Sequence, residues 1–195
     1  MNGRIIDAGM ILALWLIFTA YWAIAAIGVK RDIRRHAWLG AIASRLLVAL
    51  CVLLLARSPA LGHLSRYRRS LRSVPAHPII ALSGVVLCAL GIALAIWARW
   101  HLGRNWSAVP TLKAGHELVT TGPYAHVRHP IYTGILTALL GSALTLGVGA
   151  LIAFVGCCIV FLWRVQVEER LMQQQFPHAY PAYRARTKAL IPFIL

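Results

Sequence analysis

Long apolar runs, separated by short basic or turn-forming segments, dominate the pattern of the chain. Three of them, Ala8–Gly28, Ala37–Ala56 and Pro78–Trp97, reach the length of about 20 residues that a helix needs to cross a bilayer. Pro78 begins the third run, and proline suits the first turn of a helix because its missing N–H would have no partner there. The first 98 residues are therefore predicted to form three transmembrane helices.

A fourth apolar run, Ile131–Trp163, is too long for one crossing and too short for two full ones. Glycines near its middle interrupt the helical pattern, at Gly141, Gly147 and Gly149. We expect a tight helical hairpin with two spans of about 15 residues each. The predicted fold is thus an all-α integral membrane protein with five transmembrane helices, the last two of which form the hairpin.

The composition supports this class, since 59% of the residues are apolar and only 13% are charged, against about 25% in a soluble domain. The net charge of +15 comes from 17 Arg and 3 Lys against 5 acids. These basic residues cluster beside apolar runs, a pattern of anchoring to anionic membrane lipid that disfavours nucleic acid as a partner. The four cysteines fall inside apolar runs without metal-ligand spacing, so we expect neither a metal site nor disulfides.

The distribution of Lys and Arg between the connecting segments predicts the orientation. With the amino terminus outside, 13 basic residues fall in the inner segments and 6 in the outer ones. The five arginines of 57–72 oppose this assignment, so the side on which that segment lies stays open. The first run ends in a basic cluster without a cleavage site, which favours a retained helix over a signal peptide. Together with the excess of Arg over Lys, which is typical of GC-rich bacterial genomes, this pattern predicts a bacterial inner-membrane protein.

Two polar segments remain, 99–130 and 164–195, and both fall on the predicted cytoplasmic face. The hairpin between them would bring them together. We therefore interpret residues 1–195 as a single membrane domain and expect its chemistry, as a candidate catalytic half, in 99–195, while the three helices within 1–98 carry no functional signature.

The first polar segment contains TTGPYAHVRHPIYTG, residues 120–134, which combines turn formers with His, Arg and Tyr. Pro130 suits the start of the next helix and disfavours helical geometry at His129. Arg128 and His129 would then lie at a helix amino terminus, where free N–H groups favour an anion such as a carboxylate or a phosphate. The alternative is an interfacial linker whose basic and aromatic side chains meet lipid headgroups.

The second polar segment begins with Arg164, Glu168 and Glu169, which continue out of the last apolar helix. Arg164 and Glu168 are four residues apart and share a helix face, so a simple ion pair is one interpretation. Ionisable groups at a membrane boundary are functional candidates, and two adjacent glutamates are unusual in a chain with 5 acids. These three side chains are therefore predicted site residues.

Taken together, GHELVTTGPYAHVRHPIYTG and the later EERLMQQQFPHAYPAYRARTKALIP resemble the isoprenylcysteine carboxyl methyltransferase family and its wider relatives, the phospholipid N-methyltransferases. The resemblance covers about Gly103–Pro192. Arg-His-Pro alone would be a weak signal, but the order Gly-His, Leu-Val, Gly-x-Tyr, Arg-His-Pro-x-Tyr and then Glu-Glu is specific. The resemblance implies S-adenosylmethionine, bound in a cytosolic pocket that the loop before the fourth helix and the C-terminal segment form together.

The resemblance implies cofactor contacts at eight positions: His116, Leu118, Val119, Tyr124, His129, Pro130, Tyr132 and Glu168. It also implies that Arg164 lies beside a substrate carboxylate. The residue chemistry agrees, since Arg128 and His129 can meet the cofactor's carboxylate, Glu168 its ammonium, and aromatic rings its adenine or sulfonium. The sequence has no glycine-rich Rossmann loop.

We therefore expect a membrane methyltransferase with a lipophilic substrate, such as the carboxylate of a prenylated cysteine. A carboxylate nucleophile needs no general base, and Arg164 would orient it. An amine nucleophile, as in phospholipid N-methylation, would need a base, and Glu169 or a histidine could serve. A nicotinamide-dependent membrane reductase and a non-enzymatic lipid-binding scaffold are the rival interpretations. The physiological substrate and the oligomeric state stay open.

Overall fold

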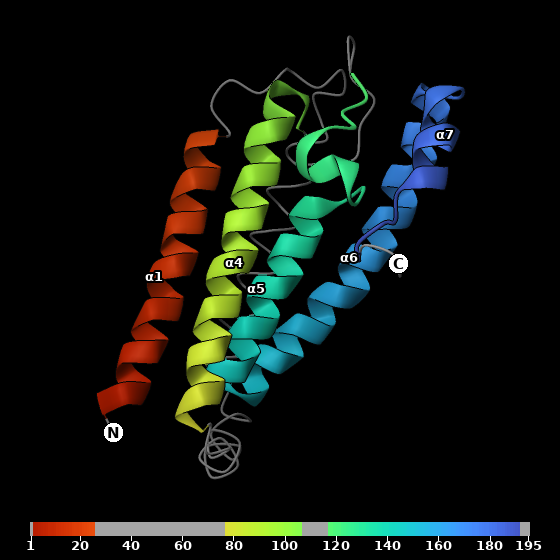
Figure 1. Cartoon of the computed structure of the whole chain (residues 1–195). Helices are drawn as coiled ribbons and strands as arrows, with labels where there is room; N and C mark the ends of the chain where they lie inside the picture. The colour runs from red at the N-terminus through yellow and green to blue at the C-terminus, as the bar shows by residue number, and fades with distance from the viewer. Residues whose placement is uncertain (1, 26–76, 107–116, 192–195) are drawn as a thin grey trace, which may run out of the picture.

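The computed structural model describes residues 2–25, 77–106 and 117–191, and most of these residues are helical. The predicted second helix, Ala37–Ala56, and the predicted site residue His116 lie outside this part of the chain. The elements in chain order are α1 (Asn2–Ala25), α4 (Pro78–Leu102), the short 3₁₀ turns η1 (Gly103–Asn105) and η2 (Gly122–Ala125), α5 (Pro130–Leu146), α6 (Val148–Gln175) and α7 (Ala179–Arg186). Figure 1 shows α1, α4 and α5 side by side, with α6 slanting away from α5 toward α7.

Three helices in the described ranges are long and apolar enough to cross a membrane: Ile6–Ala25, Pro78–Leu102 and Ala150–Gln175. A fourth apolar helix, α5, is shorter. Large apolar side chains project from the outer faces of these helices, as Leu16 on α1 and Ile159 on α6 illustrate. This distribution suits contact with lipid rather than water. The count of five spans stays a prediction.

The closest helix pair is α4 and α5, which pack through facing glycines. Gly84 and Gly91 on α4 meet Gly141 and Gly134 on α5, in antiparallel order. At each of these positions an added Cβ would come within 3.0 Å of the opposite backbone. Small residues let helix backbones approach closely, which is the main source of van der Waals contact between helices in lipid.

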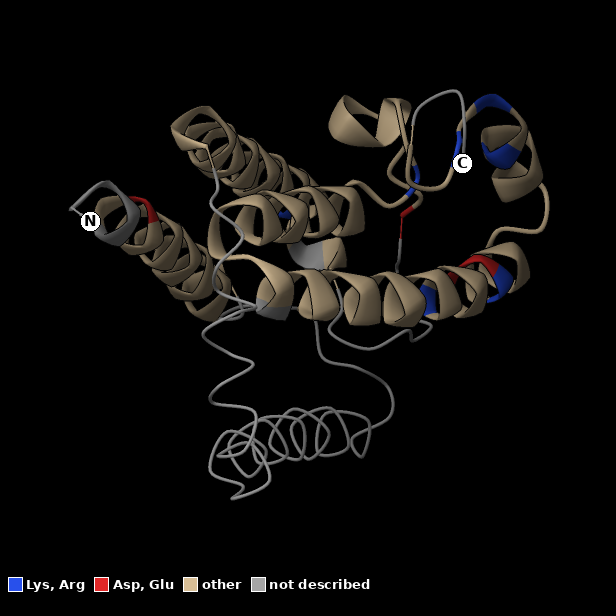
Figure 2. Ribbon diagram, turned by 90° about the horizontal axis from the view of Figure 1, so that it is seen from below, with Lys and Arg blue, Asp and Glu red and all other residues tan. Residues whose placement is uncertain are grey.

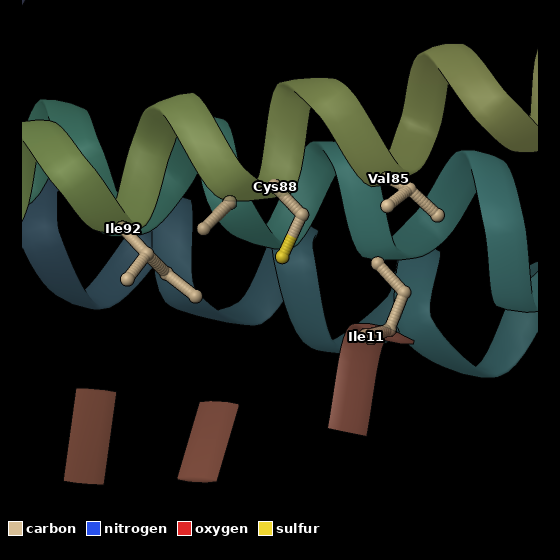
Figure 3. Packing of buried hydrophobic residues seen from close by; sticks show 5 residues of the cluster. Ile11, Val85, Cys88 and Ile92 are labelled. Carbon is tan, nitrogen blue, oxygen red and sulfur yellow. The ribbon is translucent and has the colours of Figure 1, made fainter. Parts of the chain in front are cut away.

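A small apolar core joins α1 to this pair. Figure 3 shows Ile11 of α1 pointing toward Val85 of α4, with Cys88 and Ile92 farther along the same helix, and all four side chains are buried. Beside this core, Trp15 Nε1 donates to Ser142 Oγ on α5 over 3.0 Å. The contact gives the indole N–H the partner that it cannot find in lipid.

The apolar run Ile131–Trp163 is divided at Gly147, where α5 ends and α6 begins. Gly147 adopts φ 88° and ψ −156°, a backbone region open in practice only to glycine. From this point α6 continues as one helix to Gln175, well beyond the predicted end of the apolar run at Trp163. Arg164 and Glu168 therefore lie on the direct continuation of the apolar helix, as predicted.

The end of α4 differs from the prediction, which ends the span at Trp97 and assigns Arg99 to the following loop. The helix runs to Leu102, so the predicted boundary between 98 and 99 falls inside its last turns. Arg99 is buried, donates to Ala25 O over 2.5 Å and to Gly103 O over 2.8 Å, and lies 4.4 Å above the Trp106 ring. Carbonyl groups at helix C-termini lack partners within the helix. One arginine thus supplies donors to the ends of two helices, which explains why the charge is buried.

Candidate functional site

Charged residues gather where α6 approaches α7 and the C-terminal segment, while the other described helices are almost free of them (Figure 2). Six of the predicted site residues meet here. Three come from the end of the loop and the first turn of α5, and three from the second half of α6. They are Arg128, His129 and Tyr132, and Arg164, Glu168 and Glu169.

Glu168 is the centre of one half of this cluster. Its Oε1 accepts a hydrogen bond from the Tyr132 hydroxyl and lies 3.3 Å from the Arg164 NH2 group. Its Oε2 lies 3.5 Å from His129 Nδ1. The Tyr132 ring stacks on Phe161 at 4.5 Å between centroids and lies nearly parallel to the His129 ring at 5.7 Å. These ring contacts hold the hydroxyl and the imidazole toward the same carboxylate.

Glu169 is the centre of the other half and is buried. Its Oε1 accepts from Arg128, with Nε at 2.8 Å and NH2 at 2.7 Å. Its Oε2 lies 3.3 Å from Arg184 Nε, a residue of α7 that the sequence analysis does not select. Two guanidinium groups therefore hold this carboxylate, and that of Arg128 is as buried as the carboxylate itself.

His129 connects the two halves, since its Nε2 lies 3.6 Å from Glu169 Oε1 while its Nδ1 faces Glu168. Burial alone would lower the pKa of His129, but the contacts with both carboxylates outweigh burial and hold the pKa above the ordinary value of histidine. The imidazolium form is therefore favoured. His129 Nε2 is buried and has no hydrogen-bond partner among the described residues.

The start of α5 differs from the prediction that the amides of Arg128 and His129 are free for an anion. The Arg128 N–H donates to Lys188 O over 2.8 Å, and the His129 N–H donates to Ala189 O over 3.0 Å. Val127 and Lys188 form a parallel β-bridge at the same place. The segment that follows α7 thus takes these two donors, so the anion that the sequence predicts at this helix start would have to be held by other groups.

The other predicted residues have different surroundings. Pro130 is buried at the first position of α5, and Leu118 and Val119 lie half-buried in the segment before η2. Tyr124 is buried in η2, where its hydroxyl donates to Ala98 O over 3.4 Å and its carbonyl accepts from the Tyr183 hydroxyl over 2.7 Å. Tyr124 therefore joins α4, η2 and α7, and both of its polar groups are engaged within the protein.

The sequence analysis missed the part of the site after α7. Thr187 O and Arg184 O both accept from Arg128 NH1, and Leu190 O accepts from the Thr133 hydroxyl over 2.6 Å. These are backbone carbonyls, which carry no signature in the side-chain pattern. The aromatic spacing of Tyr180 and Tyr183, both buried, was the available signal that this segment packs against the protein.

Metal ligation has little support in the part of the chain that the structure covers. Residues 2–25, 77–106 and 117–191 contain no group of three or more His, Cys, Asp or Glu side chains that could hold a metal ion. In the cluster described above, the guanidinium groups of Arg128, Arg164 and Arg184 face the two carboxylates.

Comparisons with known proteins identify relatives with this arrangement of segments. The family profile described as phospholipid methyltransferase matches residues 79–179. A protein-S-isoprenylcysteine O-methyltransferase of Schizosaccharomyces pombe is 35% identical over 112 residues, which is 55% of this chain and 47% of the relative. A cobalt-zinc-cadmium resistance protein of Cupriavidus metallidurans is 33% identical over 112 residues, 55% of this chain and 49% of the relative. The chain thus spans about half the length of these curated relatives.

A solved structure of a eukaryotic intramembrane Ras methyltransferase, isoprenylcysteine carboxyl methyltransferase, is similar to 98% of this chain, which covers 68% of that structure. The TM-score is 0.62 and the sequence identity is 23%. The likeness shows a shared fold. Together with the apolar helices, it shows that the chain is a membrane protein.

Proposed function

This chain belongs to the phospholipid methyltransferase family, and we propose that it is an S-adenosylmethionine-dependent methyltransferase that acts on a lipophilic carboxylate, such as that of a prenylated cysteine. The names of the isoprenylcysteine O-methyltransferases among its relatives support the reaction and the substrate class. The observation that carries the proposal is the cluster of His129, Glu168 and Glu169, in which arginines hold both carboxylates.

The cluster fits S-adenosylmethionine, which would supply a methyl group on a positively charged sulfur. The buried Nε2 of His129, without a hydrogen-bond partner in the described part, could donate to an oxygen of the cofactor. Glu168 provides a carboxylate for an ammonium group. Leu118, Val119, Tyr124 and Pro130, together with His116, would complete the proposed pocket.

Arg164 is the proposed substrate residue. Its contact with Glu168 is 3.3 Å long, and its side chain is 27% exposed, so the guanidinium can turn toward a second carboxylate without leaving a buried charge unpaired. It lies one helical turn before Glu168, on the side of the apolar part of α6. A carboxylate carried on a lipid tail would meet Arg164 from that side.

The contacts of the two glutamates favour a nucleophile that needs no proton removal. A general base must have a free lone pair and must compete successfully for the proton. Glu168 already accepts from Tyr132 and pairs with Arg164, and Glu169 already accepts from Arg128. A carboxylate substrate is deprotonated at neutral pH, so catalysis reduces to aligning it and excluding water.

Phospholipid amine N-methylation is the second candidate, because the matching family profile carries that description. An amine would have to lose a proton, and Glu169 is the proposed base for this reaction. Glu169 would first have to release Arg128 and Arg184.

We also propose that the site faces the cytoplasm of a bacterial inner membrane. The support comes from the charge distribution, since the inner segments hold 13 basic residues and the outer ones 6. Arg128, Arg164 and Arg184 lie in one cluster, which is compatible with that orientation.

The test is a titration of the purified protein in detergent with S-adenosylhomocysteine, followed by a methyl-transfer assay. His129→Ala and Glu168→Gln should each weaken S-adenosylhomocysteine binding by at least about tenfold, which corresponds to about 1.4 kcal/mol. Glu117→Gln is the matched control, because Glu117 is an exposed carboxylate and the same change there should leave affinity unaltered.

The methyl-transfer assay compares a prenylated cysteine with a free carboxylate, its methyl ester, and a phospholipid with a primary amine. Methylation of the free carboxylate alone supports the proposal, and methylation of the amine supports the second candidate. Unchanged affinity in both site variants, or binding of NADPH in place of S-adenosylhomocysteine, would overturn the assignment of the cofactor site.

A further inference from the structure

We infer that Arg128 is a positioning residue, which holds the segment Thr187–Leu190 across the start of α5, rather than a direct contact of the cofactor. The expected effect of Arg128 on cofactor binding rests on the proposed function. The contacts that support the positioning role are independent of any ligand. It differs from the sequence-based expectation, in which Arg128 meets the cofactor's carboxylate.

Each of the three nitrogens of the Arg128 guanidinium has a contact within the protein. Nε and NH2 face Glu169 Oε1 at 2.8 and 2.7 Å, and NH1 donates to Thr187 O and, over 3.3 Å, to Arg184 O. The Arg128 side chain is only 9% exposed. A direct bond from Nε or NH1 to a cofactor carboxylate would replace a contact with Glu169 or with the carbonyls of Thr187 and Arg184, and weakening the buried ion pair with Glu169 is costly.

The same segment is also fixed by its backbone. The amides of Arg128 and His129 donate to Lys188 O and Ala189 O, and the Thr133 hydroxyl donates to Leu190 O. Leu190 is buried, and so is Val127 at the bridge. We call these hydrogen bonds, which join the loop, α5 and the segment after α7, the seam. Arg128 therefore adds side-chain contacts to the seam.

His129 lies next to this seam and between the two carboxylates. Its backbone N–H is held by Ala189 O, and its Nε2 faces Glu169, whose position Arg128 fixes. Loss of the Arg128 contacts should therefore move His129 and loosen Thr187–Leu190 together. Arg128 would affect cofactor binding through these neighbours.

Limited trypsin digestion of the full-length protein in detergent, without ligand, tests whether Arg128 holds the segment Thr187–Leu190 in place. Cleavage after Lys188 requires its backbone to leave the bridge with Val127. Arg128→Gln should raise the cleavage rate after Lys188 by about tenfold or more. Arg128→Lys should raise it less, because lysine keeps the positive charge but not the several planar N–H donors of the guanidinium group. Arg186→Gln is the control, since Arg186 is exposed and donates only within α7, to Ala182 O.

A second variant, Thr133→Val, removes the hydroxyl that donates to Leu190 O and leaves Glu169 untouched. It should also raise cleavage after Lys188, and the double variant with Arg128→Gln should show less than the product of the two effects, because both loosen the same segment. Since Thr133→Val keeps the ion pair intact, it tests the seam even where Arg128→Gln fails to fold.

Ligand affinity tests whether Arg128 contacts the cofactor directly. The two ligands are S-adenosylhomocysteine and methylthioadenosine, and the second lacks the amino-acid carboxylate and ammonium. A positioning role predicts that Arg128→Gln weakens S-adenosylhomocysteine binding together with the rise in cleavage after Lys188, because the effect passes through His129. A loss confined to S-adenosylhomocysteine, with cleavage after Lys188 unchanged, would show direct contact and overturn the inference. If the wild type binds neither ligand, the proposed function fails, while the digestion still decides whether Arg128 holds the segment.

Discussion

Replacing Gly91 by alanine tests the close approach of α4 and α5. A Cβ at Gly91 would lie 2.5 Å from the Gly134 carbonyl oxygen and 2.9 Å from the Ala138 Cα, besides contacting the Ala138 amide nitrogen. All three are backbone atoms, so no side-chain rotation relieves the overlap and the helices must move apart. Gly156 on α6 is the matched control, because a Cβ there meets nothing within 4 Å.

The magnitude follows from two opposing effects. Overpacking a close interface costs about 1–3 kcal/mol, and backbone neighbours place Gly91→Ala toward the upper end. Alanine gains about 1 kcal/mol over glycine in a helix interior, and both variants share this gain. We expect Gly91→Ala to lower the free energy of unfolding by about 1–2 kcal/mol, while Gly156→Ala leaves it unchanged or raises it by up to about 1 kcal/mol.

The assay is thermal unfolding of both variants in the same detergent, followed by circular dichroism. At about 2–4 °C per kcal/mol for a chain of this size, the Tm values should differ by about 2–12 °C, with the Gly91→Ala variant lower. Gly91→Ala should also weaken S-adenosylhomocysteine binding, because α5 begins at Pro130 and carries Tyr132 into the proposed site. Equal Tm values for the two variants would refute the close approach of the helices.

Two further predictions concern the charged cluster. Arg164→Ala should reduce the rate of single-turnover methylation by about tenfold or more and leave cofactor affinity nearly unchanged. Arg164→Lys should restore only part of the rate. A parallel loss of cofactor affinity would mean that Arg164 serves only as the partner of Glu168. Because the pKa of His129 is raised on folding, the stability that its charge contributes is fully present below about pH 6.5 and is lost as the pH rises through the folded value. The Tm difference between wild type and His129→Gln should therefore narrow as the pH increases, and a difference that widens with pH would contradict the assignment of an imidazolium.

Much of the cluster could be predicted because its side chains carry local signals. Pro130 marks the start of α5, which fixes where Arg128, His129 and Tyr132 stand relative to the helix. Arg164 and Glu168 follow the apolar run at helical spacing, so their shared face could be read directly from the sequence. These inferences depend only on neighbours within a few residues.

What could not be predicted depends on contacts between distant segments. The bridge between Val127 and Lys188 involves backbone groups, and no side-chain pattern announces it. The facing glycines illustrate a different limit, since their spacing of seven residues on both helices is visible, but only the fold shows which faces meet. The sequence analysis places Arg99 at the start of the polar segment 99–130, whereas the carbonyls of Ala25 and Gly103 supply the acceptors that allow it to be buried in α4.

The hydrogen bond from Trp15 to Ser142 bears on how the protein is assembled during synthesis. Its two partners are 127 residues apart, so α1 enters the bilayer long before the ribosome has made α5. The Ala25 carbonyl likewise can accept from Arg99 only after the ribosome has made 74 more residues. Helices in lipid associate after they have inserted, as a second stage of folding. Until then the indole N–H of Trp15 needs a partner near the membrane surface or in the translocation machinery. The bundle therefore closes around α1 only late in biogenesis.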